Sequence, residues 1–226
     1  MLARADGYIG TLIDDLVTRG TSEPYRMMTS RSEYRLLLRQ DNADERLVPI
    51  GVRVGLNSPE RGEKVRRKYE TVQQEIDRVA SVGVAPSEKL NALLEAHHST
   101  PLKAGCKLID LLRRPELSYA ALAPFDPERP ELSAVIREQV EIRIKYAGYI
   151  ERQERDVEQY RRLQSRPLPL DLDYNEVDSL RLEARQKLNA VKPLNFGQAA
   201  RISGVSPADI TALMIYIETH RKGEKA

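Results

Sequence analysis

The longest stretch that the sequence predicts to be helical, roughly residues 133–164, contains no proline and most constrains what this chain can fold into. Its one glycine is Gly148, and the nearest prolines on either side are Pro130 and Pro167. Proline lacks a backbone N–H and clashes with the preceding helical turn, so a long stretch without it favours an uninterrupted helix. At ~1.5 Å per residue, this helix would be roughly 45 Å long.

Two apolar stripes run along the predicted helix, so it should pack against more than one neighbour. The natural antiparallel partner is a second helix over 59–82, where Ser58 is a good cap and Pro59 suits the first helical position. Apolar residues recur in this second helix at steps of three or four, which is typical of a packing seam. The seam consists of Val65, Tyr69, Val72, Ile76 and Val79.

The remaining periodic segments predict shorter helices and one strand. Within 25–39, Tyr34, Leu36 and Leu38 alternate with Arg35, Leu37 and Arg39, which favours a half-buried strand, or one strand of a short pair. Ser30 and Glu33 also fit the capping box that opens a helix, so both structures stay open there. Further helices are expected over 7–18, 87–97, 102–113, 178–190, 195–203 and 207–221.

These elements predict a mainly α, multi-helical protein with a long antiparallel helical arm and a small C-terminal bundle. We expect three parts: a junction segment over 1–57, a helical arm over 58–166 and a three-helix subdomain over 167–226. The second boundary follows the motif Arg166-Pro-Leu-Pro169, which stops the long helix.

The composition, 41% hydrophobic and 31% charged, is typical of a globular protein. No run of 18 apolar residues is present, so no membrane partner is expected. The single cysteine, Cys106, excludes a disulfide within the chain and favours a cytoplasmic location. The net charge of +2 does not by itself indicate a nucleic-acid binder, so local clusters matter more than the sum.

Familiar catalytic and cofactor motifs are missing from the sequence. It contains no GxGxxG dinucleotide loop, no phosphate-binding GK[ST] loop and no HExxH zinc pair. Cys106 lies in an apolar stretch and is better explained as a small buried side chain than as a nucleophile. His97 and His98 fit a solvated helix end. We therefore assign no catalytic, cofactor-binding or metal-binding residue, and do not expect the chain to be an enzyme by itself.

Clustered arginines are the sharpest chemical feature. Between residues 26 and 39, four arginines accompany one acid, Glu33. Guanidinium groups bind phosphate in two-pronged fashion, and neighbouring tyrosines can stack on unpaired bases. The alternative is that these arginines form ion pairs with Glu23, Glu33, Asp41 and Asp44. The RNA-binding candidates in this block are Arg26, Arg31, Arg35, Arg39, Tyr25 and Tyr34.

A second group of basic residues lies in the long helix, where seven of them between 143 and 166 accompany four acids. Arg152 and Arg155 are the candidates for contact with an RNA backbone. The alternative is a solvated helix face on which opposite charges pair at i,i+4.

The segment 198–210 resembles a DNA-binding helix-turn-helix in its pattern of small, glycine and capping residues. Its second helix, however, carries no lysine or arginine between Pro207 and Thr219, which argues against reading bases. Its apolar side chains belong in a core or against another protein. The candidates for docking a partner are Ile210, Leu213, Met214 and Ile217.

Residues 23–47, EPYRMMTSRSEYRLLLRQDNADERL, closely resemble a signature block of the MnmG family, also called GidA. The segments DGYIGTLIDDL at 6–16, LLRRPE at 111–116 and QVEIRIKYAGYIERQ at 139–153 are also similar to the family, as are residues 188–210. Together these segments extend the resemblance over nearly the whole chain.

The resemblance implies the C-terminal part of an enzyme that uses FAD and NADH to modify carbon 5 of the wobble uridine in tRNA. It implies as partners tRNA, the GTPase MnmE and the FAD-binding domain of the same enzyme, and it leaves a homodimer open. The family's flavin loop and catalytic cysteines precede the region seen here, so no cofactor is expected in this chain. The role implied is tRNA binding and partner docking; the alternative is a purely structural or protein-interaction module without RNA contact.

Overall fold

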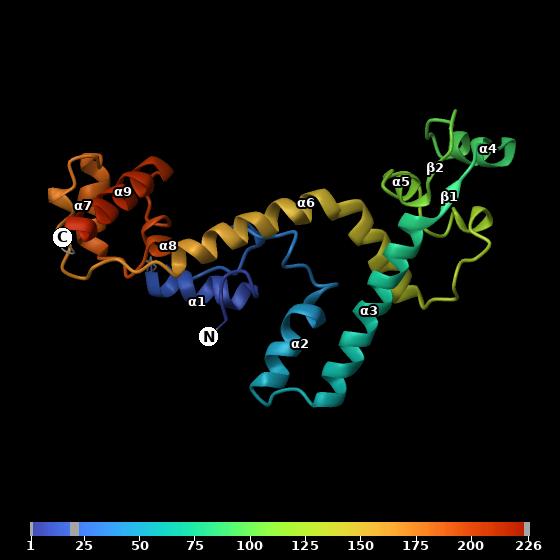
Figure 1. The fold of residues 1–226 in the computed structure, drawn as a ribbon. Helices are drawn as coiled ribbons and strands as arrows, with labels where there is room; N and C mark the ends of the chain where they lie inside the picture. The colour runs from blue at the N-terminus through green and yellow to red at the C-terminus, as the bar shows by residue number, and fades with distance from the viewer. Residues whose placement is uncertain (1, 19–22, 224–226) are drawn as a thin grey trace. The chain divides into compact units, whose positions relative to one another are not determined.

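The computed structural model describes residues 2–18 and 23–223, which are mainly helical (Figure 1). Three short 3-10 helices lie at Thr29–Arg31, Ala123–Phe125 and Tyr174–Glu176. The α-helices are α1 (Tyr8–Thr18), α2 (Ala43–Arg53), α3 (Pro59–Ser81), α4 (Glu88–Ala96), α5 (Leu108–Leu112), α6 (Ala134–Gln164), α7 (Leu182–Val191), α8 (Phe196–Ala199) and α9 (Pro207–Gly223). The two strands are β1 (Gly83–Val84) and β2 (Cys106–Lys107).

The chain divides into two compact units. The terminal unit combines Met1–Arg35 with Gln153–Ala226, and the central unit is Leu36–Arg152. Helix α6 contributes residues to both. The three-part division expected from the sequence, with boundaries after 57 and 166, groups the residues differently and stays a prediction.

Helices α2 and α3 form an antiparallel hairpin in the central unit (Figure 1). Ser58 caps α3 by accepting a hydrogen bond from the Arg61 N–H, and Pro59 takes the first helical position, as predicted. Gly55 in the connecting turn has a φ of +78°, which a residue with a side chain adopts only under strain.

The predicted packing of α3 against α6 is only partly right. Helix α3 makes its most extensive helical contacts with α2, whereas α6 adds Val140 and Ile144 to a core that also holds Val72 and Val79. This core is completed by side chains from α4, α5 and the segment that follows, namely Leu90, Leu94, Leu108, Leu111, Leu112, Leu117, Tyr119 and Leu122.

The strand predicted within 25–39 is wrong. Among the residues that the structure describes, the only two strands are β1 and β2, which pair antiparallel with Gly83 opposite Lys107 and Val84 opposite Cys106. Residues 25–39 instead contain a single 3-10 turn at Thr29–Arg31. The alternating pattern has another cause: Tyr34 and Leu38 are single buried anchors, 5% and 4% exposed, and no neighbouring strand pairs with this segment.

The other predicted helices differ from the structure mainly in length. The helix predicted over 102–113 is confined to Leu108–Leu112, because Cys106 and Lys107 pair with β1 instead. The helix predicted over 195–203 is likewise reduced to Phe196–Ala199. Helices α1, α3, α4, α6, α7 and α9 confirm the predictions to within a few residues at each end.

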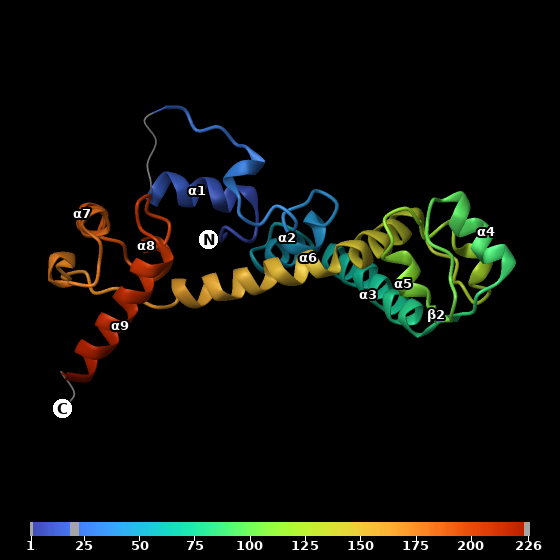
Figure 2. The ribbon, with the colours of Figure 1, turned by 90° about the horizontal axis from the view of Figure 1, so that it is seen from above.

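The terminal unit has its own core, built where α7, α8 and α9 meet the chain between α6 and α7 (Figure 2). Ser206 and Asp209 form a reciprocal N-terminal cap of α9: each side chain accepts a hydrogen bond from the other residue's backbone N–H. The core consists of Leu168, Tyr174, Val177, Leu180, Leu188, Phe196, Ala199, Ile210, Leu213 and Ile217.

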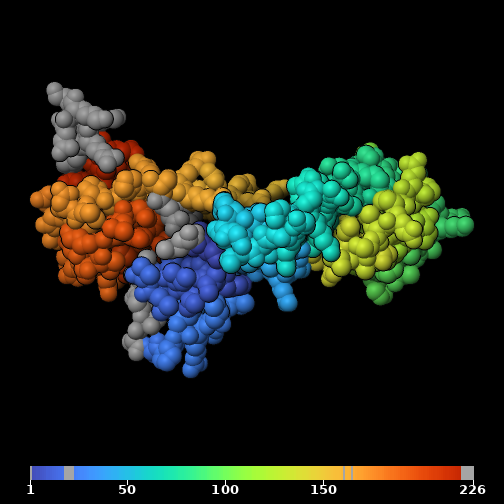
Figure 3. Space-filling model, turned by 90° about the horizontal axis from the view of Figure 1, so that it is seen from below, coloured from blue at the N-terminus to red at the C-terminus, as the bar shows by residue number. Residues whose placement is uncertain are grey.

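Helix α1 of the terminal unit turns its polar side inward. Thr11 and Asp15 are 1% and 3% exposed, and Gly10 lies so close to the Ala3 carbonyl oxygen that a Cβ there would be 2.1 Å from it. Most of the apolar side chains of this helix are instead exposed, and the helix is seen at the surface in the space-filling view (Figure 3). Its exposed apolar residues are Ile9, Ile13, Leu16 and Val17.

A buried ionic cluster ties α3 to the segment before α6. Arg78 Nη2 lies 2.8 Å from Glu75 Oε1 and 2.5 Å from Asp126 Oδ2, and both carboxylate side chains are only 3% exposed. The Tyr119 hydroxyl donates a further hydrogen bond of 2.6 Å to Glu75. These two carboxylates therefore depend on one guanidinium for charge compensation.

We expect Arg78→Met to destabilise the protein by about 3–5 kcal/mol, because it leaves two buried carboxylates without their cation. Urea unfolding followed by far-ultraviolet circular dichroism measures the loss. The matched control is Arg66→Met, also on α3, where Arg66 pairs with Glu63 and Glu70 on the solvent side and little change is expected. Equal midpoints for the two variants would contradict a stabilising role for the buried cluster.

Candidate nucleic-acid interface

The arginine-rich block is held in the terminal unit by a buried hub, Arg4, whose side chain is 2% exposed. Its guanidinium contacts three carboxylates: Asp14 at 3.0 Å, Asp15 at 2.6 Å and Glu33 at 2.9 Å. Burial disfavours the charged form of Arg4, but the hydrogen bond to Asp15 and the charge of Glu33 outweigh it, so the pKa of Arg4 lies above its usual value. Arg4 also donates a hydrogen bond of 3.2 Å to the Arg31 carbonyl oxygen. The backbone around Arg31 and Glu33 is thereby fixed to the N-terminal segment.

The side chains of three arginines of the block take no part in this hub. Arg26, Arg31 and Arg35 are exposed, and none forms an ion pair or a side-chain hydrogen bond with a residue that the structure describes. The Arg31 guanidinium lies over the ring of Tyr25, 5.2 Å from its centroid. These three groups are free to bind an anion.

The two tyrosine candidates are placed differently. The Tyr25 hydroxyl donates a hydrogen bond of 2.8 Å to Asp15, and burial and this bond raise the pKa of Tyr25. Tyr34 is 5% exposed, and burial, with the nearby Glu33, raises its pKa to about 12. Tyr34 therefore offers no ring surface, and Tyr25 is half-buried with one face taken by Arg31.

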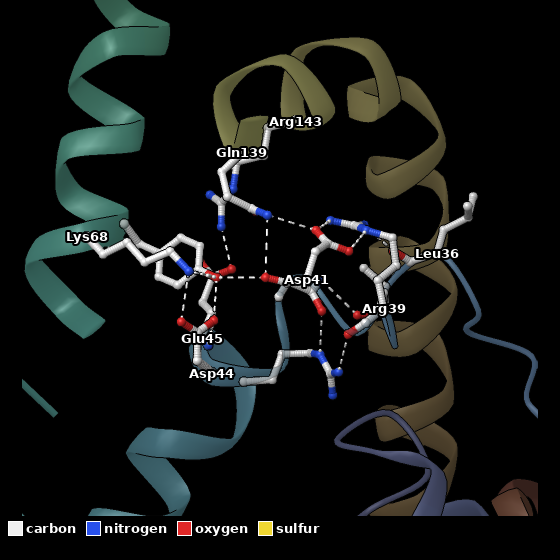
Figure 4. Close-up of polar contacts among 12 residues, drawn as sticks. Leu36, Arg39, Asp41, Asp44, Glu45, Lys68, Gln139 and Arg143 are labelled. Carbon is white, nitrogen blue, oxygen red and sulfur yellow. Dashed lines mark hydrogen bonds and ion pairs between the residues drawn. The ribbon is translucent and has the colours of Figure 1, made fainter. Parts of the chain in front are cut away.

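Arg39 belongs to a polar network of the central unit that joins residues 36–46 to α3 and α6 (Figure 4). It donates a hydrogen bond of 2.9 Å to Asp41, which also accepts one of 3.0 Å from Gln139 of α6. Burial opposes ionisation of Asp41, but the hydrogen bonds from Arg39 and Gln139 prevail, so the pKa of Asp41 is lowered. The alternative of internal ion pairing thus holds for Arg39.

The same network also pairs the charged side chains of Asp44, Glu45, Lys68 and Arg143 (Figure 4). Lys68 and the Tyr69 hydroxyl of α3 contact Asp44 at 2.8 and 2.6 Å, and burial offset by these bonds leaves the pKa of Asp44 lowered. Arg143 of α6 pairs with Glu45 and lies over the Tyr69 ring at 4.9 Å. The sequence analysis did not identify Arg143, Gln139 or Lys68, because their partners are about 20 to 100 residues away in the chain.

On α6, Arg152 and Arg155 are exposed and form no ion pair with any described residue. Of the i,i+4 pairs that a solvated helix face would form here, the one between Glu158 and Arg162 is present at 3.3 Å. Both candidates are thus available for an external anion.

The docking candidates on α9 lie inside the terminal unit. Ile210, Leu213 and Ile217 are 5%, 0% and 6% exposed and belong to its core, and Met214 packs against that core. The sequence left two alternatives for these residues, a core or a contact with another protein, and the structure shows them in or against the core. Ile215, 59% exposed, is the large apolar side chain that α9 presents to solvent in its described part.

Cys106 lies in β2 and is partly buried. Burial and the charge of Asp110 raise the pKa of the Cys106 thiol, which disfavours the reactive thiolate. His97 caps the end of α4, as predicted. Among the side chains that the structure describes, no group of three His, Cys, Asp or Glu could hold a metal ion, and no described helix is long and apolar enough to cross a membrane.

Comparison with known proteins identifies the family. The profile of the tRNA modifying enzyme MnmG/GidA C-terminal helical domain matches residues 59–154, and that of the MnmG/GidA C-terminal helical bundle matches residues 156–226. The chain is similar over 95% of its length to a crystal structure of GidA from Aquifex aeolicus, with a TM-score of 0.73 and 35% identity, and it covers 33% of that chain.

The chain is also 53% identical over 225 residues to the tRNA uridine 5-carboxymethylaminomethyl modification enzyme MnmG of Caldicellulosiruptor saccharolyticus. It is 54% identical over 227 residues to the MnmG of Alkaliphilus oremlandii. It is covered almost completely in both alignments but spans only 36% of either relative. With two matching domain profiles and relatives above 50% identity, the chain belongs to the MnmG/GidA family, whose C-terminal helical region it matches.

Proposed function

We propose that this chain is the tRNA-binding and partner-docking part of an FAD- and NADH-dependent enzyme that modifies carbon 5 of the wobble uridine. The observation that carries the proposal is that five exposed arginines, Arg26, Arg31, Arg35, Arg152 and Arg155, form no ion pair with a residue that the structure describes. Unpaired guanidiniums are suited to phosphate, and the relatives are named as tRNA-modifying enzymes. A protein acting on tRNA would work in the cytoplasm.

The described residues do not fit a flavin site of their own. The two strands are two residues long, and no glycine-rich loop joins a strand to a helix as in dinucleotide-binding folds. We therefore place FAD, NADH and the redox chemistry in the part of the enzyme that this chain does not span. The role of the chain is to bind and position the RNA.

The first test is a salt titration of tRNA affinity for the unchanged chain and for Arg26→Ala, Arg31→Ala and Arg35→Ala. Each lost phosphate contact should reduce the slope of log K against log salt by about 0.7–0.9 and weaken binding. Filter binding with unmodified tRNA gives both quantities.

Arg39→Ala is the matched control, because Arg39 is already paired with Asp41. It should change the urea midpoint more than the salt slope. Unchanged slopes in the three exposed variants would rule out their contact with the RNA backbone.

The alternative function, a module that holds other proteins together, is favoured by helix α1, most of whose apolar side chains face solvent. Exposed apolar residues on one helix face mark a surface that another protein part covers. Since the relatives are almost three times as long as this chain, we propose that the FAD-binding part of the same enzyme covers Ile9, Ile13, Leu16 and Val17.

We expect Ile13→Glu, which alters the exposed face alone, to weaken association with the separately produced FAD-binding part at least tenfold. The charge would have to be buried without a partner on binding. Isothermal titration calorimetry measures the affinity, and Val135→Glu, at another exposed apolar residue, on α6, serves as the control. Undiminished affinity in Ile13→Glu would remove α1 from that interface.

We further propose that the C-terminal bundle docks the GTPase MnmE. Because Ile210, Leu213 and Ile217 are core residues, they would act by holding α9 in place, and the direct contact would come from Ile215. Ile215→Glu should reduce capture of the GTPase severalfold in sedimentation experiments without lowering the urea midpoint. The same run on the chain alone tests whether it forms a homodimer. Full capture by Ile215→Glu would place the docking surface elsewhere.

A further inference from the structure

Helix α6 exposes two aromatic rings in the central unit. Tyr146 is 42% exposed and Tyr149 is 63% exposed, whereas the other phenylalanine and tyrosine side chains that the structure describes are buried or half-buried. The two rings contact each other in a tilted arrangement, with centroids 6.5 Å apart and planes at 53°. A pair of aromatic rings in water is unusual because burying such rings is a major source of stability.

Arg152 continues the same row. Tyr146, Tyr149 and Arg152 follow one another at steps of three residues, which places their side chains side by side on one ridge of the helix. We call these three residues the Tyr–Arg ridge. Arg152 is exposed and has no ion pair or hydrogen bond with a described residue. Nearby Lys145, by contrast, contacts Glu141 at 2.8 Å and the Pro115 carbonyl oxygen at 3.2 Å.

The fold does not account for the ridge. The two other tyrosines of the central unit each donate a short hydrogen bond to a carboxylate, Tyr69 to Asp44 and Tyr119 to Glu75. The hydroxyls of Tyr146 and Tyr149 have no such partner among the described residues. Their rings therefore contribute little to the stability of this unit, and a ligand is the better explanation.

We propose that the Tyr–Arg ridge is a stacking platform for an unpaired base of the bound RNA, with Arg152 holding an adjacent phosphate. This inference rests on the proposed tRNA-binding function and names the part of the RNA that is recognised. Single-stranded nucleic acid is typically bound by aromatic rings that stack on bases, next to cations that follow the backbone. A base in a tRNA loop supplies both the flat ring and the neighbouring phosphate.

A protein partner fits the ridge less well. Tyrosine and arginine are common in protein interfaces, but there they are surrounded by contacts that exclude water. On α6 the apolar neighbours Ile142 and Ile150 are half-buried, and the nearest exposed large aliphatic residue in its described part is Val135. The ridge is thus an aromatic strip among polar side chains rather than the centre of an apolar patch.

The test compares Tyr149→Ala, Tyr149→Leu and Tyr149→Phe in the full chain, using unmodified tRNA and a blunt RNA duplex without a loop. Tyr149→Ala should bind tRNA about 5- to 150-fold more weakly, with an unchanged salt slope, since stacking releases no ions. Tyr149→Leu should be as weak, whereas Tyr149→Phe should bind within about twofold of the unchanged chain, because phenylalanine keeps the aromatic face. Binding to the duplex should be the same for all.

Arg152→Ala should instead reduce the salt slope, and Val135→Ala, exposed on the same helix, should change nothing. Equal tRNA affinity for Tyr149→Ala and the unchanged chain would overturn the ridge proposal alone. Full affinity in Tyr149→Leu, or an equal loss on the duplex, would overturn base stacking. If the unchanged chain binds no tRNA, the proposed function fails and the ridge proposal with it.

Discussion

The charge of the buried Arg4 guanidinium must be matched from within the terminal unit, and much of the local structure follows from this requirement. A cation out of water is stable only when carboxylates and hydrogen bonds surround it, and here Asp14, Asp15 and Glu33 do so. Two of these acids lie on α1, so the helix turns its polar side inward and its apolar side to the surface. The third acid fixes the arginine-rich block, which leaves its own guanidiniums free. The buried cation Arg4 thus explains both the exposed apolar side of α1 and the exposed arginines of the arginine-rich block.

Arginines in this chain fall into two groups that the residue type alone does not distinguish. Arg39, Arg78 and Arg143 each contact a carboxylate, and their charges are neutralised locally. Arg26, Arg35 and Arg152 have no such partner in the described structure. Because paired charges have weak fields at a distance, the surface potential depends on the second group. A net charge of only +2 is therefore compatible with RNA binding.

The sequence predicts well those elements whose signals are local. The cap at Ser58, the proline at position 59 and the uninterrupted stretch that became α6 each determine structure within a few residues. Helix α2 was missed because Pro49 lies in its interior, where proline is usually excluded. The strand expected near Tyr34 was wrong because no neighbouring strand pairs with this segment, and the burial of the polar side of α1 depends on Arg4, which lies outside the helix. For Arg39 the sequence allowed either RNA binding or an internal ion pair, and only the structure decides between them. The burial of Tyr34, which the sequence suggested as a residue that stacks on bases, also follows only from the structure.

The two kinds of exposed group on α6 would contribute differently to recognition. Contacts between arginine and phosphate are long-ranged and independent of base identity, so they give affinity for any RNA and lose it as salt rises. Stacking on Tyr149 requires a base that is free of its own helix, and it depends little on salt. The arginine contacts attract the RNA, and stacking on Tyr149 distinguishes an RNA loop from a duplex. The modification that we propose for the whole enzyme requires access to a single unpaired nucleotide, so a helix that detects unpaired bases would add to its selectivity.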